Sequence, residues 1–379
     1  MISLYFHIPF CSKKCPYCHF YVIPNKAAYH PLLAEGLERE WQMRLPQTGK
    51  APIQSIYFGG GTPSLFGPAQ IGQVLQRIGN RAPDCEITLE ANPEEIDEAR
   101  LCLFREVGIN RLSLGVQSLD DRSLQTLERI HTASKAKEAI FAAKQAGFDN
   151  ISIDLMYDLP GQTEASWRYT LDQIGDLPIT HLSLYNLTIE PHTPFDRRKA
   201  TLLPLIPPPE LSLKLLQSAV EELEKKGLHR YEISAFAKAG CESKHNVGYW
   251  IGRPFLGFGP SAFSFWEGSR FRNTPNLNKY TKLLNEGKFP VDFKEKLPYP
   301  ANVNEQLAVE LRLIRGVDLS KWELPEETLI TLDRLEKGGL LEKSPTGYRL
   351  SERGLLVYDS VAEDIISYDV RVSEAENRT

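Results

Sequence analysis

The chain has 379 residues, of which 42% are hydrophobic and 25% are charged, as expected for a folded protein with a sizeable core. Its formal net charge of -5 gives no general attraction to phosphate backbones, which argues against a nucleic-acid binder. No run reaches the roughly 18 apolar residues of a membrane span, and the opening Met1-Ile2-Ser3-Leu4 lacks the basic and apolar regions of a signal peptide. We therefore expect a cytoplasmic protein.

Short β-rich runs alternate with segments of helical spacing through the first half of the chain. The expected strands cover residues 2–7, 53–58, 86–90, 111–116, 151–155 and 181–186. The expected helices cover residues 29–44, 69–78, 95–107, 134–146 and 164–174. This alternation predicts an α/β fold whose six parallel strands form an incomplete (β/α)6 barrel, which we place at residues 1–235.

The pattern changes after Asn186. A proline-rich stretch at 204–209 precedes a helical run at 210–226. Residues 240–268 are rich in glycine and aromatic side chains, and we expect them to form irregular backbone packed on the barrel, within a connecting segment at 236–300.

A small domain is expected at 301–379. Helical patterns near 303–314 and 327–337 precede a hairpin at 340–350, which is the order of a winged helix. Residues 320–379 hold 8 Lys and Arg against 13 Asp and Glu, whereas a DNA-binding face needs a basic surface. We expect a packing or partner-binding domain.

Three of the six cysteines, Cys11, Cys15 and Cys18, lie within eight residues. Clustered thiols in a reducing cytosol indicate metal ligands or redox groups rather than disulfides. A [4Fe-4S] cube held by three cysteines keeps one iron free of protein ligands, whereas structural zinc would need a fourth Cys or His. His19 is poorly placed to be that ligand because it adjoins Cys18, though His7 could be proposed. Inert thiols are the third alternative, and we expect them for the scattered Cys85, Cys102 and Cys241.

Polar and glycine residues follow the expected strands where each strand ends. They are Cys11, the glycines and threonine at 59–62, Glu90, Gln117 and Asp154. Ligands of parallel βα folds gather at the carboxyl ends of the strands, so we expect these residues to converge. Taken singly, each could be an ordinary glycine turn, a surface ion pair or a polar strand end.

The cysteine spacing is the signature of the radical S-adenosylmethionine (SAM) superfamily. Five sequence motifs accompany it in chain order: YFHIPFC at 5–11, FGGGTPS at 58–64, EANP at 90–93, GVQS at 115–118 and DLMYDLPG at 154–161. Together they resemble the family that contains oxygen-independent coproporphyrinogen III dehydrogenase and its radical SAM haem-chaperone relatives. The resemblance runs from the first residues to the C-terminal domain.

This resemblance implies a [4Fe-4S] cluster on Cys11, Cys15 and Cys18, with SAM chelated by the open iron, and it identifies no catalytic residue. Arg129 could hold the SAM carboxylate, and Asp154 could accept hydrogen bonds from the ribose hydroxyls. The implied SAM contacts are Tyr5, Tyr17, Gly60, Gly61, Thr62, Glu90, Gln117, Arg129 and Asp154. The two tyrosines could instead be core or cluster-shielding aromatics.

Two functions remain open within this family. The dehydrogenase decarboxylates two propionates of coproporphyrinogen III to vinyl groups, whereas the chaperone binds haem and passes it to acceptor proteins. The dehydrogenase pattern continues with a fourth cysteine needed for turnover, where this chain has Phe20. The dehydrogenase also carries an N-terminal extension that we expect this chain to lack, because Cys11 follows only ten residues.

The segment HNVGYW, from His245 to Trp250, matches the His-Asn-x-x-Tyr-Trp motif of the haem-chaperone branch. Imidazole can ligate haem iron and aromatic rings can pack on a macrocycle, although a turn histidine beside two core aromatics would look the same. We expect a protein that binds a [4Fe-4S] cluster, SAM and haem, takes electrons from a donor and delivers haem to an acceptor. The alternatives are the dehydrogenase, which would make it an oxidoreductase, and a radical SAM enzyme on another substrate.

Overall fold

The computed structural model describes residues 1–49 and 51–366, so the predictions for residues 367–379 lie outside the described residues. One sheet of 12 strands organises the described chain, in the order β14-β13-β12-β11-β1-β4-β5-β6-β7-β8-β10-β9. Its six central strands are parallel and confirm the six predicted strands: β1 (Ile2–Ile8), β4 (Ile53–Gly60), β5 (Arg81–Ala91), β6 (Arg111–Gln117), β7 (Asn150–Tyr157) and β8 (His181–Asn186).

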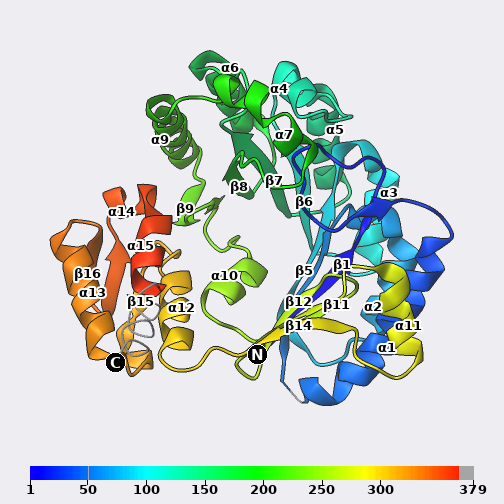
Figure 1. Cartoon of the computed structure of the whole chain (residues 1–379). Coiled ribbons are helices and arrows are strands. Elements are labelled where there is room, and N and C mark those ends of the chain that lie inside the picture. The colour runs from blue at the N-terminus through cyan, green and yellow to red at the C-terminus, as the bar shows by residue number, and fades with distance from the viewer. Residues whose placement is uncertain (50, 367–379) are drawn as a thin grey trace.

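Helices cover the outer face of the curved sheet (Figure 1). They are α1 (Tyr29–Thr48), α2 (Pro68–Arg77), α3 (Glu98–Glu106), α4 (Asp121–Thr126), α5 (Ala133–Gln145), α6 (Glu164–Asp172) and α9 (Pro209–Lys225). Successive side chains of a strand point to opposite faces, and in β1 the apolar Leu4 and Phe6 join the main core while Ser3 and Tyr5 make polar contacts. The barrel therefore has an apolar outside, packed on helices, and a polar inside.

The prediction of irregular backbone at 240–268 was wrong. This stretch contains α10 (Lys244–Trp250), β11 (Phe255–Phe258) and β12 (Phe263–Trp266). Strand β11 pairs in parallel with β1, and β12, β13 (Ser269–Asn273) and β14 (Val291–Glu295) continue the sheet in antiparallel fashion. The glycines hid these strands because they serve close backbone packing: a Cβ on Gly257 would collide with the carbonyl of Phe263.

At the other end of the sheet, β10 (Ala235–Ala237) and β9 (His229–Glu232) follow β8 in antiparallel pairing. The remaining small elements join the loops around the barrel. They are β2 (Phe10–Cys11), β3 (Ile23–Pro24), η1 (Pro63–Phe66), η2 (Pro93–Glu95), η3 (Gln173–Asp176), α7 (Pro194–Arg197), α8 (Lys199–Leu202), η4 (Leu203–Leu205) and α11 (Leu277–Asn285).

The C-terminal part forms a second core, in which Leu307, Leu332, Leu335 and Val361 are buried together. Its elements include the two predicted helices and the predicted hairpin in the expected order, with a short strand that was not predicted between the helices. They are α12 (Ala301–Glu310), β15 (Val317–Asp318), η5 (Leu319–Lys321), α13 (Glu326–Lys337), β16 (Leu341–Ser344), β17 (Gly347–Leu350), α14 (Glu352–Leu356) and α15 (Tyr358–Ile366). We propose a domain boundary near residue 300, because Leu277, Tyr280 and Leu284 belong to the main core.

Among the helices within residues 1–49 and 51–366, none is long and apolar enough to cross a membrane.

Candidate functional site

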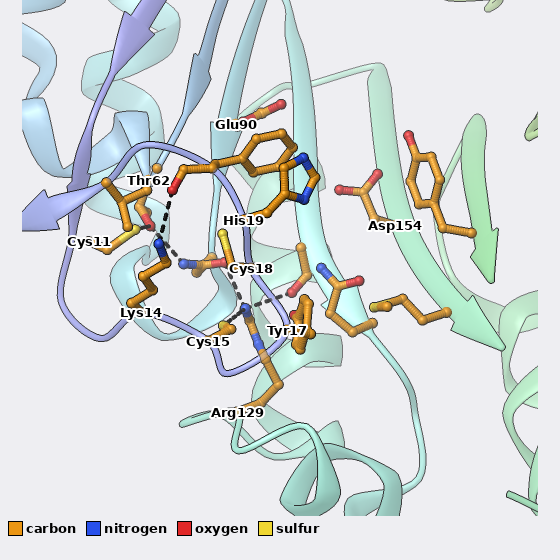
Figure 2. A pocket seen from close by; sticks show the side chains of 18 of the residues that line it. Cys11, Lys14, Cys15, Tyr17, Cys18, His19, Thr62, Glu90, Arg129 and Asp154 are labelled. Carbon is orange, nitrogen blue, oxygen red and sulfur yellow. Dashed lines mark hydrogen bonds between the residues drawn. The ribbon is translucent and has the colours of Figure 1, made fainter. Parts of the chain in front are cut away.

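A cavity of about 520 Å³ opens at the carboxyl ends of the parallel strands (Figure 2). Eleven of the residues predicted for the cluster and for SAM line it. They are Cys11, Cys15, Tyr17, Cys18, Gly60, Gly61, Thr62, Glu90, Gln117, Arg129 and Asp154. Parallel strands thus bring together residues that lie up to 143 positions apart, counted from Cys11 to Asp154.

The three clustered cysteines face this cavity from the loop that follows β1. The sulfur of Cys11 lies 3.7 Å from Oγ1 of Thr62, and the sulfur of Cys15 accepts a hydrogen bond from Nη1 of Arg129 at 3.2 Å. In the part of the chain that the structure describes, no three possible ligands converge tightly enough to hold a single metal ion. A cube needs a wider arrangement, because each thiolate binds a different iron, so three free thiols around one cavity fit the cluster.

Burial raises the pKa of the Cys11 thiol to about 11, and it also raises the pKa of the Cys18 thiol. Because iron binds the thiolate, ligation at these positions must displace a proton. The guanidinium of Arg129 lies beside Cys15 and donates a hydrogen bond to its sulfur.

Side-chain and backbone contacts fix the cysteine loop on the barrel. The amide of Phe195 donates to the carbonyl of Pro16 at 3.0 Å, and the Tyr17 ring packs edge-on against Phe195 at 6.1 Å. Tyr17 therefore lines the cavity and also belongs to a small apolar cluster below the loop. The ring centres of His19 and Phe20 lie 4.7 Å apart beside the cavity with their planes tilted by 40°, and Phe20 is 55% exposed.

The glycines after β4 are required by contacts within the protein. Gly60 has a φ of +114°, and a Cβ there would lie 2.7 Å from the ring of His7. A Cβ on Gly61 would lie 2.6 Å from the carbonyl oxygen of Phe10. These residues line the cavity, but the tight packing of β4 beside the chain after β1 is enough to explain why they are glycine.

Two carboxyl groups enter the cavity from the inside of the barrel. Glu90 accepts hydrogen bonds from the Tyr57 hydroxyl at 2.8 Å and from the Gly60 amide at 3.1 Å, and Asp154 accepts one from Ser113 at 3.5 Å. Burial raises the pKa of Glu90 to about 7 and that of Asp154 to about 6. A ligand with a positive charge or hydroxyl groups would stabilise their ionised forms.

Arg129 and Gln117 also line the cavity, with Arg129 beside the cysteine loop. Nη2 of Arg129 donates to Asn92 Oδ1 at 2.7 Å and to the Gly115 carbonyl at 2.9 Å, so the guanidinium is held between the strand ends and Cys15. Gln117 has a φ of +67°, an uncommon conformation for this residue type and one that is typical of functional sites.

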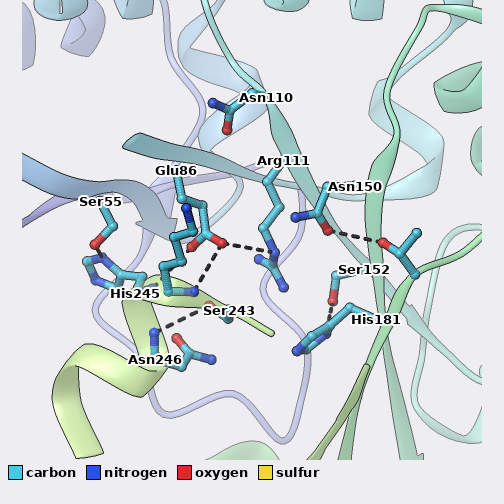
Figure 3. A network of polar contacts seen from close by, with 12 residues as sticks. Ser55, Glu86, Asn110, Arg111, Asn150, Ser152, His181, Ser243, His245 and Asn246 are labelled. Atoms are coloured by element: carbon cyan, nitrogen blue, oxygen red, sulfur yellow. Dashed lines mark hydrogen bonds and ion pairs between the residues drawn. The ribbon is translucent and has the colours of Figure 1, made fainter. Parts of the chain in front are cut away.

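Tyr5 and His245 are not among the residues that line this cavity. The Tyr5 hydroxyl lies 3.1 Å from Nδ1 of His7, and the Tyr5 ring packs against Gly59. His245 is 1% exposed, and its Nδ1 atom lies 2.9 Å from Ser55 Oγ (Figure 3). Its Nε2 atom lies 2.7 Å from the Tyr249 hydroxyl. Burial lowers the pKa of His245 to about 3, so the ring is neutral. Haem contact at His245 stays a prediction.

The helix that carries His245 closes the opposite end of the barrel. The carboxylate of Glu86 accepts hydrogen bonds from the backbone amides of Lys244 and His245, each at 3.1 Å, and lies 3.9 Å from Nε of the buried Arg111. Two charged residues of the barrel thus hold the first turn of α10 (Figure 3).

The structure adds cavity residues that we did not predict from the sequence. Ser113, Gly115, Met156, Tyr185 and Asn186 all line the cavity. Gly115 and Met156 are each two positions from a predicted residue on the same strand, Gln117 and Asp154, and side chains two apart share a face. For these two residues, the alternation of side chains along a strand was the signal in the sequence.

An incomplete parallel barrel with three cysteines on the loop after its first strand defines a radical SAM protein, and the Radical SAM superfamily model matches residues 5–174. The heme chaperone HemW of Bacillus subtilis is 33% identical over 376 residues, which cover 95% of this chain and 98% of that protein. The chain belongs to the HemW family of radical SAM proteins.

Two further relatives define the breadth of the similarity. The mitochondrial radical S-adenosyl methionine domain-containing protein 1 of Danio rerio is 32% identical, with 96% of this chain and 86% of that protein covered. The structure of the coproporphyrinogen III oxidase HemN from Escherichia coli superposes with a TM-score of 0.83 at 26% identity, and covers 97% of this chain and 90% of that one.

Proposed function

We propose that this protein binds haem and transfers it to acceptor haem proteins. The observation that carries this proposal is the similarity to HemW proteins over nearly the full length of both chains, including the C-terminal domain. Relatives from Lactococcus lactis and Haemophilus influenzae, at 33% and 37% identity, have the same name, heme chaperone HemW.

Radical SAM family membership implies a [4Fe-4S] cluster and SAM. We propose that Cys11, Cys15 and Cys18 hold the cluster, since all three thiols face one cavity. The reduced cluster supplies the electron that cleaves SAM in this superfamily, so an electron donor would be a further partner. The proposed SAM-contacting residues in that cavity are Tyr17, Gly60, Gly61, Thr62, Glu90, Gln117, Arg129 and Asp154, with Tyr5 supporting Gly59 from below.

The cavity contains residues of both charges, which would bind different groups of SAM. Arg129 offers a cation beside the cysteine loop, where it would attract a carboxylate. Glu90 and Asp154 offer carboxylates inside the barrel, where they would attract an ammonium group or accept from hydroxyls. The Tyr17 ring lines the cavity beside these groups and would offer an apolar contact.

His245 would contact haem only after α10 moves away from the end of the barrel that it closes. Both ring nitrogens are already within hydrogen-bonding distance of Ser55 and Tyr249. Ligation of iron would therefore require the loss of these contacts, and those of Glu86 with the first turn of α10.

Coproporphyrinogen III oxidation is the alternative, which the overall likeness to HemN favours. Phe20 argues against coproporphyrinogen III oxidation. The resemblance places a fourth cysteine needed for turnover at this position, whereas the exposed phenyl ring of Phe20 carries no ionisable or redox-active group.

An anaerobic comparison of the two activities tests the proposal. The protein is reconstituted with iron and sulfide, then titrated with haem and, in parallel, incubated with coproporphyrinogen III, SAM and a reductant. We expect stoichiometric haem binding and no vinyl product from the wild type. Phe20→Cys is the matched variant, and porphyrinogen turnover by the wild type would overturn the proposal.

A further inference from the structure

A second cavity, of about 500 Å³, lies between the last strands of the barrel and the C-terminal domain. Its barrel side is formed by Tyr157 and Leu184, and its other side by residues 355–360 at the junction of α14 and α15. Tyr185 and Asn186 line both this cavity and the cysteine-bearing one, so the two spaces adjoin at the end of β8. The volume lies within the roughly 300–1,000 Å³ range of small-molecule sites.

Both walls of this interdomain cleft carry exposed apolar surface. Leu356 is 43% exposed and Val357 is 40% exposed on the C-terminal side, and Tyr185 is 45% exposed on the barrel side. Apolar side chains that face each other across a cavity favour an apolar ligand between them.

Two arginines line the cleft, and Nε and Nη2 of Arg230 both donate to the carbonyl of Ile233. Arg230 on β9 and Arg312 after α12 both line it, and Asp359 is the one acidic residue among its described lining residues. Nη2 of Arg312 donates to Glu232 at 3.2 Å and to Ser234 at 3.3 Å, whereas its buried Nε has no hydrogen-bond partner within residues 1–49 and 51–366.

The guanidinium of Arg312 is oriented by aromatic rings. It lies 4.3 Å from the ring centre of Trp250, the last residue of the HNVGYW motif, and 5.3 Å from that of Tyr358. The carbonyl of Trp250 also accepts a hydrogen bond from Gln306 of α12 at 3.0 Å. The motif helix, fixed to the barrel by His245, thus orients a cation of the cleft.

We propose that the interdomain cleft is the haem site, with Arg230 and Arg312 binding the two propionates and the exposed side chains of Tyr185, Leu356 and Val357 contacting the macrocycle. This inference rests on the proposed haem function and deepens it. A guanidinium is well suited to a carboxylate because it donates two parallel hydrogen bonds. Trp250 is a positioning residue for Arg312, which gives the HNVGYW motif a role that needs no iron ligation by His245.

Equilibrium titrations with haem and with haem dimethyl ester test the site. In the wild type we expect haem to bind and the ester, which lacks both carboxylates, to bind at least about tenfold more weakly. Arg230→Gln and Arg312→Gln should each weaken haem binding by roughly ten- to hundredfold. The matched control is Arg168→Gln. The Arg168 side chain is 70% exposed on α6 and is not among the residues that line the cleft.

Equal affinity for haem and its ester, or wild-type affinity in both arginine variants, would overturn the cleft site while the haem function stands. Failure of the wild type to bind haem at all would instead overturn the proposed function. Arg230→Gln and the wild-type ester comparison keep the test valid if Arg312→Gln unfolds because Glu232 loses its partner.

The role of Trp250 has a separate readout. Trp250→Ala should weaken haem binding by about tenfold with no change in the cluster's visible absorbance, and Trp250→Phe should restore most of the affinity by keeping a ring beneath Arg312. Equal haem affinity in the wild type and Trp250→Ala would contradict this positioning role.

Discussion

Nδ1 of His245 lies 2.9 Å from Oγ of Ser55, and this contact joins the motif helix α10 to the barrel strand β4 across 190 positions of sequence. Nε2 of the same ring lies 2.7 Å from the Tyr249 hydroxyl. The histidine that defines the HNVGYW motif is therefore part of the framework in this conformation, and its first measurable effect should be on stability.

His245→Ala should lower the free energy of unfolding by about 2–4 kcal/mol, because it leaves a cavity and removes the partner of two buried hydroxyls. The measurement is the urea midpoint. His229→Ala is the control, since the His229 side chain is 63% exposed and its hydrogen-bond partner is the surface residue Glu224. Indistinguishable midpoints for the wild type and His245→Ala would refute the anchoring role.

Replacing Cys11, Cys15 or Cys18 by Ala should abolish the visible absorbance of the reconstituted cluster, because each thiolate is proposed to bind a different iron. Iron and sulfide content, measured on the same samples, should fall with it. Cys241→Ala removes a thiol outside the cavity-lining set and should leave both measurements unchanged. A full cluster in all three cavity variants would eliminate the ligand assignment.

The buried carboxyl of Glu90 should make stability fall as pH rises. Its pKa is raised from 4.5 to about 7 by burial, with Asp154 nearby opposing ionisation and Arg111 favouring it. The folded state therefore holds its proton up to about pH 7, whereas the unfolded state releases it near pH 4.5. The contribution of Glu90 to the free energy of unfolding is therefore fully present below about pH 4.5 and is lost as pH rises through about 7.

Glu90→Gln removes this titration and should gain up to roughly 3 kcal/mol over the wild type between pH 5 and pH 8, at about 1.4 kcal/mol per pKa unit. Urea midpoints at both pH values measure the difference. The exposed Glu164→Gln supplies the control, with its side chain 58% exposed. A difference between Glu90→Gln and wild type that does not change with pH would contradict the raised pKa.

Gly60→Ala should cost roughly 2–4 kcal/mol of stability and also weaken SAM binding. Its φ of +114° disfavours any side chain, and the new Cβ would lie 2.7 Å from the His7 ring. Gly79→Ala is matched in chemistry but meets no atom within 4 Å. Thermal unfolding and SAM titration of both variants check the prediction, and equal melting temperatures would disprove the steric argument.

The six parallel strands could be predicted because each is a short apolar run bounded by helical segments. Their direction then placed the cysteine loop, Glu90, Gln117 and Asp154 at one end of the sheet. Strand β11 was missed because Gly257, needed for close packing, breaks its apolar pattern, and β13 and β14 were missed because charged residues interrupt theirs. Sequence spacing carries no signal for backbone contacts of this kind.

The limits of sequence reasoning are clearest at Tyr5 and His245. The motifs that contain these two residues indicated ligand contacts. In the structure Tyr5 instead contacts His7, and His245 contacts Ser55 and Tyr249. The interdomain cleft was equally hidden, since Arg230 and Arg312 meet only when the C-terminal domain packs near β9 (Figure 1).

The central claim is that this chain hands haem to another protein, and the rate of transfer tests it most directly. Haem-loaded protein is mixed with increasing concentrations of an apo b-type cytochrome, and transfer is followed by absorbance. We predict a rate that rises with apo-cytochrome concentration, as in direct hand-over between bound partners. A rate that stays constant and equals the rate of haem loss to an excess of scavenger would contradict the claim.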